Sequence, residues 1–267
     1  MNLNDVRALV IDMDGVLWRG DTPLPGLAEF FDFLYERELS FMLATNNASK
    51  TPEQYLAKFD RFGVTVARDR VLTSSLATAA YLQNELVPGT NVYVVGQDGL
   101  TEAMREAGFN VLEDSSQPAG AVVAGIDFTL TYDKLKHAAF LIQRGARFVG
   151  SNGDLTFPAE EGMFCPGAGA ILAAIEASTG VKPTLVGKPN RLMFDIAVQK
   201  LGSDPQHTAM LGDRLETDIL GGQQAGLKTI LVATGVDNQA TVEEKGIHPD
   251  VIFSGIDTLV ETWRAAS

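Results

Sequence analysis

Short apolar runs alternate with amphipathic stretches along the whole chain. The runs are three to five residues long and read as strands buried on both faces, which is typical of parallel sheets. They comprise residues 8–11, 41–44, 91–95, 121–124, 146–149, 184–186, 209–211, 228–232 and 251–253. Between them, apolar residues recur at helical spacing, as at Leu27, Phe30, Phe31 and Leu34. Strands that alternate with helices predict an α/β fold with parallel sheets.

The middle of the chain keeps this alternation but loses the acidic residues that follow other strands. Helices are predicted there at 74–86, 100–107, 134–143 and 168–177, between the strands already named. Such a block can form a compact α/β unit of its own. We therefore expect a Rossmann-like core made of 1–75 and 185–267, with a second α/β domain, 76–184, inserted in it.

The first buried run stops at two acidic residues, Asp12 and Asp14, followed by Gly15. The carboxyl end of a strand is where open α/β sheets bind ligands. Two acids crowded there repel one another unless a cation lies between them, and oxygen ligands suit Mg²⁺. With a metal present, one carboxylate could attack phosphorus and the other could exchange protons with the leaving group and water. The alternative interpretation is a plain turn in which an aspartate caps a loop.

Polar residues also follow the second predicted strand. Thr45, Asn46 and Asn47 offer a hydroxyl and two amides that can donate hydrogen bonds to an anion. These residues also lead into a helix-capping loop, since Thr51-Pro52-Glu53-Gln54 fits a capping box. Both interpretations can hold together.

Two later strand ends carry charge. Lys188 lies between a strand end and a helix start, where an anion would meet an ammonium and free N–H groups. Asp213 follows the run 209–211 and is a candidate metal ligand, and Asp218 can return to the same pocket. The alternatives are a solvated lysine in a turn and an aspartate that favours a helix dipole.

The composition of the chain argues against some classes of binding partner. The formal net charge of −13 argues against nucleic-acid binding, which needs a basic surface. The single cysteine, Cys165, excludes an intrachain disulfide and fits a reducing compartment. No signal peptide and no bilayer-spanning run is recognisable. We therefore expect a cytoplasmic protein that binds neither nucleic acid nor membrane.

The four polar strand ends together resemble the four motifs of the haloacid dehalogenase-like hydrolase superfamily. In chain order the segments are Asp-Met-Asp-Gly-Val-Leu, Ala-Thr-Asn-Asn, Gly-Lys-Pro-Asn and Gly-Asp-Arg-Leu-Glu-Thr-Asp. The longest gap lies between the second and the third. This order is similar to the branch of p-nitrophenyl phosphatases, phosphoglycolate and pyridoxal phosphate phosphatases and bacterial sugar-phosphate phosphatases, which carry a large α/β cap in that gap. The resemblance extends to Trp18, to 151–154 and to 234–236.

The resemblance implies roles for individual residues. Asp12 would be the nucleophile that forms an aspartyl-phosphate, and Asp14 would protonate the leaving oxygen and then activate water. Mg²⁺ would be held by Asp12, the backbone carbonyl of Asp14 and Asp213, with Asp218 supporting through water.

The same resemblance assigns the phosphoryl oxygens of the transition state to Thr45, the Asn46 N–H and Lys188. Charge spreads over those oxygens during transfer, so such a site acts mostly by positioning and electrostatic stabilisation.

Other classes fit less well. Dehalogenases of the superfamily have no use for an acid at Asp14, so its presence favours phosphate transfer. A receiver-type signalling module is shorter and places its paired acids before the phosphorylated one. A catalytically silent binding protein would be expected to lack one of the acids, and none is missing.

The expected substrate is a small phosphorylated metabolite, because a cap that closes over a site excludes bulky chains. By resemblance, the loop 155–158 faces the pocket, and Phe157 stands where the pyridoxal phosphate phosphatases have a histidine. Phe157 is either a pocket residue or part of the cap core. The sequence leaves the oligomeric state open, with a homodimer through the cap as one alternative.

Overall fold

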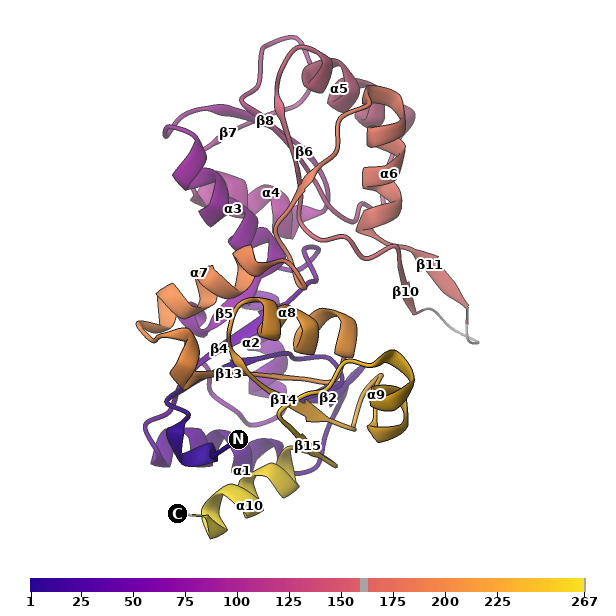
Figure 1. The fold of residues 1–267 in the computed structure, drawn as a ribbon. Helices are drawn as coiled ribbons and strands as arrows, with labels where there is room; N and C mark the ends of the chain where they lie inside the picture. The colour runs from indigo at the N-terminus through magenta and orange to yellow at the C-terminus, as the bar shows by residue number, and fades with distance from the viewer. Residues whose placement is uncertain (159–162, 267) are drawn as a thin grey trace. The chain divides into compact units, whose positions relative to one another are not determined.

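The computed structural model describes residues 1–158 and 163–266, which form two compact units (Figure 1). Unit 1 comprises Met1–Thr45, Glu53–Leu72 and Lys188–Ser267, and unit 2 comprises Asn46–Pro52 and Thr73–Gly187. Each unit carries its own sheet, as expected for an α/β protein. The segment Asn46–Pro52 falls in unit 2, whereas the sequence analysis grouped it with the first domain.

Unit 1 is built on a six-stranded sheet in the order β15-β14-β13-β1-β4-β5. The neighbouring pairs from β15 through β4 are parallel. β1 therefore lies in the middle, beside one strand from early and one from late in the chain. The strands are β1 (Ala8–Ile11), β4 (Ser40–Thr45), β5 (Val71–Thr73), β13 (Thr208–Gly212), β14 (Lys228–Val232) and β15 (Val251–Phe253).

Helices cover both faces of this sheet. On one face, Leu9 and Ile11 of β1 belong to a buried cluster with side chains of α1, α2 and α10, including Phe31 and Trp263. On the other face, α7 contacts β1 and β4, and α8 contacts β14. The helices are α1 (Leu27–Glu36), α2 (Pro52–Arg61), α7 (Arg191–Leu201), α8 (Leu220–Gln224), α9 (Gln239–Lys245) and α10 (Ile256–Ala265), with shorter helical turns η1 (Leu3–Asp5), η2 (Arg68–Arg70), η4 (Pro205–His207) and η5 (Leu215–Ile219).

Unit 2 contains a five-stranded parallel sheet in the order β12-β9-β8-β6-β7. Its core lies between this sheet and helices α5 and α6, where Val122, Phe148 and Ile175 are buried in one cluster. Helices α3 and α4 pack against each other, and α4 also contacts β6 and β7. The elements are α3 (Ser74–Glu85), β6 (Asn91–Val95), α4 (Asp98–Glu106), β7 (Asn110–Leu112), β8 (Ala121–Ala124), α5 (Tyr132–Gln143), β9 (Arg147–Gly150), α6 (Ala168–Thr179) and β12 (Thr184–Leu185).

Two small hairpins are additions that the apolar pattern does not predict. In unit 1, β2 (Trp18–Arg19) pairs with β3 (Thr22–Pro23) between Gly15 and the helix that begins at Leu27. In unit 2, β10 (Thr156–Pro158) pairs with β11 (Phe164–Pro166), so the expected loop 155–158 contains a strand.

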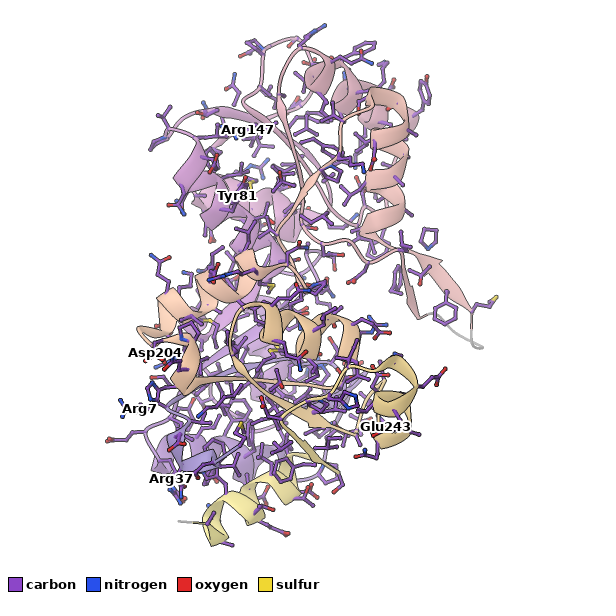
Figure 2. All side chains as sticks on the ribbon, in the orientation of Figure 1. Arg7, Arg37, Tyr81, Arg147, Asp204 and Glu243 are labelled. Atoms are coloured by element: carbon purple, nitrogen blue, oxygen red, sulfur yellow. The ribbon has the colours of Figure 1, made fainter. Side chains whose placement is uncertain are left out.

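Charged side chains cover the outside of the molecule. Arg37 and Glu243 of unit 1, both labelled in Figure 2, are exposed. None of the described helices is both long and apolar enough to cross a membrane.

Candidate active site

Two neighbouring strands deliver the first two acids. Asp12 follows β1 directly, and its N–H continues the ladder by donating to Leu211 O over 2.9 Å. Asp213 follows β13, which pairs with β1 in parallel register. Parallel neighbours end at the same edge of a sheet, so the two carboxylates meet there.

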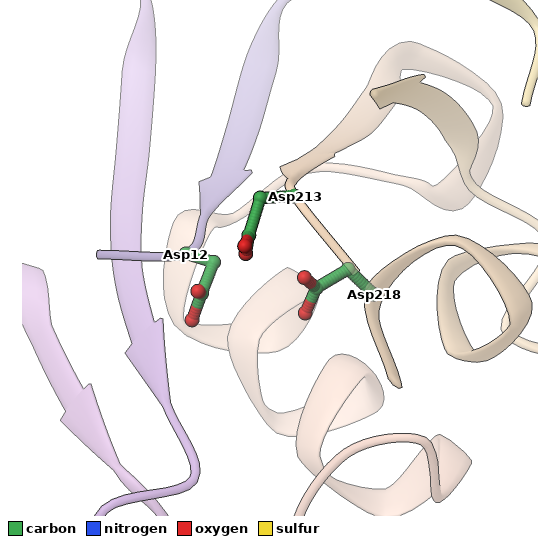
Figure 3. Close-up of side chains that lie close together, drawn as sticks. All are labelled: Asp12, Asp213 and Asp218. Atoms are coloured by element: carbon green, nitrogen blue, oxygen red, sulfur yellow. The ribbon is translucent and has the colours of Figure 1, made fainter. Parts of the chain in front are cut away.

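The third acid, Asp218, lies on a short π-helical turn, η5, which precedes helix α8. Its Oδ2 accepts from the Arg214 N–H at 3.1 Å, which holds the side chain back towards the strand end. One carboxylate oxygen from each of Asp12, Asp213 and Asp218 lies within 4.8 Å of the others (Figure 3). We call these three residues the acidic cluster.

Lys188 pairs with two members of the acidic cluster. Its Nζ donates to Asp12 Oδ1 at 2.6 Å and to Asp218 Oδ1 at 2.7 Å, and it lies 3.2 Å from the carbonyl oxygen of Ala44. The lysine side chain is 3% exposed. The ammonium is buried and forms ion pairs with two carboxylates. The alternative of a solvated lysine in a turn is therefore wrong.

Burial and mutual repulsion control the ionisation of the cluster. Burial, together with the Asp218 and Asp213 charges, raises the pKa of Asp12 well above its usual value despite the attraction of Lys188. Burial and Asp218 raise the pKa of Asp213 to about 6. Burial alone would lower the pKa of Lys188, but Asp12 and Asp218 raise it, so this lysine stays charged.

The donor set fits a hard divalent cation. Three carboxylates share one ammonium, so the ionised cluster carries an excess of negative charge that burial makes unfavourable. All the candidate ligand atoms are oxygens, and no histidine or cysteine belongs to the cluster. Oxygen-only sites of this kind suit Mg²⁺ better than Zn²⁺.

Asp14 faces a different partner. Its Oδ1 accepts from the indole Nε1–H of Trp18 at 2.8 Å, across the start of the β2–β3 hairpin. The backbone N–H of Gly15 donates to Trp18 O at 2.8 Å in the same turn. Asp14 is therefore held beside the strand end but outside the acidic cluster.

The polar residues after β4 divide between the units. Thr45 ends β4 in unit 1 and is buried. Asn46 and Asn47 belong to unit 2. There the Asn46 amide donates to Asp154 Oδ2 at 3.1 Å, and Asn47 Oδ1 accepts from the N–H and the hydroxyl of Ser49.

Unit 2 contains a pocket of about 220 Å³ beside these amides. Phe157 lines it and meets Phe128 edge to face, with ring centroids 6.0 Å apart. Phe157 is half-buried and belongs to none of the described core clusters, so it is a pocket residue. The pocket has polar and apolar walls, formed by Asn46, Asn47, Ala48, Ser49, Ile126, Phe128, Asn152, Asp154, Thr156, Phe157, Gly167 and Ala168.

A fourth buried acid, Asp237, supports the cluster and was missed by the sequence analysis. Its N–H donates to the backbone oxygen of Asp213 at 3.0 Å, and its Oδ2 accepts from the Leu215 N–H at 2.8 Å. Its Oδ1 also lies 2.8 Å from Lys245 Nζ. The available signal was its place in the segment that follows β14, the strand that pairs with β13.

Comparisons with known proteins agree with the motif assignment. A family model described as haloacid dehalogenase-like hydrolase matches residues 9–110, and one described as HAD-hydrolase-like matches 185–259. The chain is 34% identical to an acid sugar phosphatase of Staphylococcus saprophyticus, over 97% of this chain and 98% of the relative.

Solved structures are similar over almost the whole length. A 4-nitrophenylphosphatase from Thermotoga maritima is 36% identical with a TM-score of 0.91, over 98% of this chain and 99% of the other. A p-nitrophenyl phosphatase from Archaeoglobus fulgidus is 32% identical with a TM-score of 0.90, over 97% and 99% of the two chains.

Proposed function

Because this chain belongs to the haloacid dehalogenase-like hydrolase family and is a phosphatase, we propose that it hydrolyses small phosphorylated metabolites through an aspartyl-phosphate on Asp12. The observation that carries the proposal is the convergence of Asp12, Asp213 and Asp218 within 4.8 Å, with Lys188 Nζ 2.6 Å from Asp12. The names of the relatives support a sugar phosphate or aryl phosphate as the class of substrate.

In the first step, a carboxylate oxygen of Asp12 attacks phosphorus. The bond between phosphorus and the leaving oxygen breaks, and Asp14 gives its proton to that oxygen. In the second step, Asp14 takes a proton from water as the water oxygen attacks the same phosphorus. The bond between phosphorus and Asp12 then breaks, which releases phosphate and restores both carboxyl groups.

The remaining residues of the site stabilise the negative charge of the phosphoryl group. Asp12, Asp213 and the backbone carbonyl of Asp14 would hold Mg²⁺, with Asp218 supporting through water. The bound ion would supply positive charge to the phosphoryl group and lower the repulsion between Asp12 and the incoming phosphate. Lys188 supplies an ammonium, and Thr45 a hydroxyl, to the phosphoryl oxygens. Asn46 and Asn47 stay predictions from the motif.

The residues of unit 1 in this scheme act on the phosphoryl group, which all phosphomonoesters share. Discrimination among leaving groups must therefore come from other side chains, and the pocket of unit 2 offers them. Its apolar wall, Ile126, Phe128 and Phe157, suits a leaving group with an apolar face, and its amides suit hydroxyl groups.

The nucleophile is tested with Asp12→Asn, which keeps the shape and removes the attacking charge. We expect p-nitrophenyl phosphate hydrolysis to fall to background. Asp21→Asn is the matched control, since the Asp21 side chain is 84% exposed in the same unit. Near wild-type turnover by folded Asp12→Asn would rule out covalent catalysis by this residue.

The metal is tested by removal. Activity should vanish in EDTA and return on adding Mg²⁺, whereas Zn²⁺ should restore less. Full turnover in metal-free buffer would contradict this part of the proposal and leave the role of Asp12 untouched.

A further inference from the structure

Within residues 1–158 and 163–266, the one hydrogen bond found for the Asp14 side chain comes from a tryptophan. Trp18 Nε1–H donates to Asp14 Oδ1 at 2.8 Å. Trp18 is fully buried, whereas Asp14 is exposed. One oxygen of the carboxyl group is thus tied to a side chain that solvent does not reach.

Trp18 is itself held on several sides. Phe59 meets it edge to face with centroids 4.9 Å apart, and Phe62 lies 5.9 Å away at a tilt. Its backbone oxygen accepts from Gly15 N–H within the hairpin turn. Since neither the ring nor its backbone is free to move, the N–H points to a fixed place.

A buried cation lies over the same ring. Lys58 Nζ is 4.2 Å from the centroid of Trp18 and donates to Gly20 O, in the turn between β2 and β3, at 2.6 Å. The lysine is 7% exposed. A cation over an indole face draws electron density from the ring, which makes the ring N–H a stronger donor.

We infer that Trp18 is a positioning residue for Asp14, and that Lys58, which lies over the indole ring, supports it. The indole N–H occupies Oδ1, so the proton that Asp14 gives to the leaving oxygen and later takes from water travels on Oδ2. Fixing one oxygen removes rotational states in which neither oxygen faces the reacting atoms. The inference rests on the proposed function, in which Asp14 is the general acid and base.

The test separates positioning from packing by using two leaving groups. An alkoxide leaving group, as from glycerol phosphate, needs a proton in the transition state, whereas nitrophenolate does not. The readout is kcat/KM, which reports only steps through the first phosphoryl transfer. We expect Trp18→Phe to lower kcat/KM for glycerol phosphate by roughly 10–100-fold, part of a general-acid contribution of about 10²–10⁴. For p-nitrophenyl phosphate it should change by less than about threefold, since no proton transfer is lost.

The second tryptophan of the chain provides the matched control. Trp263 is also buried in unit 1, where it packs against Phe33 at 5.4 Å. Trp263→Phe removes the same atoms, and we expect the ratio of the two kcat/KM values to stay as in the wild type. An equal loss for both substrates in Trp18→Phe would show a purely structural role and overturn the inference.

Lys58→Met leaves the indole in place and removes the cation, together with its hydrogen bond to Gly20 O. We expect the same selective loss for glycerol phosphate, by about threefold to tenfold, because cation–π attraction is a modest term. If Trp18→Phe does not fold, the test rests on Lys58→Met. An unchanged ratio of kcat/KM for glycerol phosphate to kcat/KM for p-nitrophenyl phosphate in that variant would overturn the inference.

Asp14→Asn separates the proposed general-acid role of Asp14 from its positioning by Trp18. A selective loss for glycerol phosphate in Asp14→Asn, without one in Trp18→Phe, would keep the proposed acid and reject its positioning by Trp18. No selective loss in Asp14→Asn would instead reject Asp14 as the general acid.

Discussion

Gly235 faces Asp213 so closely that a Cβ on the glycine would lie 1.7 Å from Asp213 Oδ2. The next residue, Val236, donates its N–H to the same oxygen at 2.8 Å. On another side, a Cβ on Gly15 would lie 2.3 Å from that oxygen, and Gly15 has a φ of +89°. Bare backbone therefore encloses one oxygen of Asp213 and fixes the direction of its carboxylate.

Gly235→Ala should displace this carboxylate and weaken metal binding. We expect the Mg²⁺ concentration for half-maximal activity to rise by about 10–100-fold, the range typical when a group that orients a ligand is lost. A Mg²⁺ titration of phosphatase activity measures it. Val236→Ala is the control, because it keeps the N–H and alters a side chain that is 54% exposed. Equal Mg²⁺ requirements in both variants would contradict the enclosure argument.

Lys188→Met should impair both stability and catalysis. Removing one partner of a buried charge network costs about 3–5 kcal/mol of unfolding free energy. The loss of a preorganised donor to phosphoryl oxygens should lower kcat by about 10²–10³. Thermal melts with and without Mg²⁺ test the first effect, and we expect Mg²⁺ to recover part of the lost stability.

A more exposed ion pair serves as the comparison for Lys188. Lys134 lies 2.6 Å from Asp127 in unit 2 and is 30% exposed. Lys134→Met should cost less stability, and its melting temperature should respond to Mg²⁺ as in the wild type. An identical response of the two variants would show that Lys188 is not coupled to the metal site.

Stabilisation by Mg²⁺ should grow with pH. Burial, with help from Asp218, raises the pKa of Asp213 to about 6, against about 3.9 when unfolded. The metal-free folded state thus holds a proton that the unfolded state releases. The stabilising contribution of this group to the free energy of unfolding is fully present below about pH 4. It is lost as the pH rises through about 6, and the total loss is on the order of 3 kcal/mol.

Mg²⁺ displaces that proton, so it should raise the melting temperature more at pH 7.5 than at pH 5. Differential scanning calorimetry at the two pH values measures the difference. Asp213→Asn removes this titrating group and should remove the part of the pH dependence that comes from it. A Mg²⁺ effect that is the same at both pH values would contradict the assignment of Asp213 as a ligand.

Phe157→Ala should change the order of preferred substrates. It removes one apolar contact in a pocket, a loss of about 1–3 kcal/mol for leaving groups that use it. We expect kcat/KM to fall by about 10–150-fold for those substrates and little for others, with Mg²⁺ activation intact. Phe164→Ala is the control, since Phe164 lies on the partner strand of the same hairpin and is 69% exposed. A uniform slowdown across a panel of phosphorylated metabolites would assign Phe157 a structural role.

The apolar pattern predicted most of the strands and helices, because burial on both faces leaves a plain signal. The run 91–95 coincides with β6, and the helix through Leu27, Phe30, Phe31 and Leu34 is α1 with those side chains buried. The convergence of Asp12, Asp213 and Lys188 was also predictable, since parallel strands end at one edge. The π-helical turn that carries Asp218 was not, because the pattern of apolar residues does not distinguish it from an α-helical turn.

The contacts that were missed are made within a short turn or between segments distant in the sequence. Each strand of the hairpin β2–β3 is only two residues long, too short for an alternation of apolar and polar residues to be recognised. Its function in holding Trp18 against Asp14 therefore had no local signature. Asp237 was missed for the same reason, since its partners Leu215 and Asp213 are more than twenty residues away.

The position of β1 in its sheet affects the order of events during synthesis. Ala8 pairs with Ser40 on one side and with Thr208 on the other. At about 5–20 residues per second, a ribosome needs roughly 10–40 s to pass from the first strand to its second partner. Every sheet strand of unit 2 emerges within that interval. The sheet of unit 2 can therefore form while β1, the strand that precedes Asp12, still has one edge unpaired. A chaperone that binds nascent chains would meet the protein in that state.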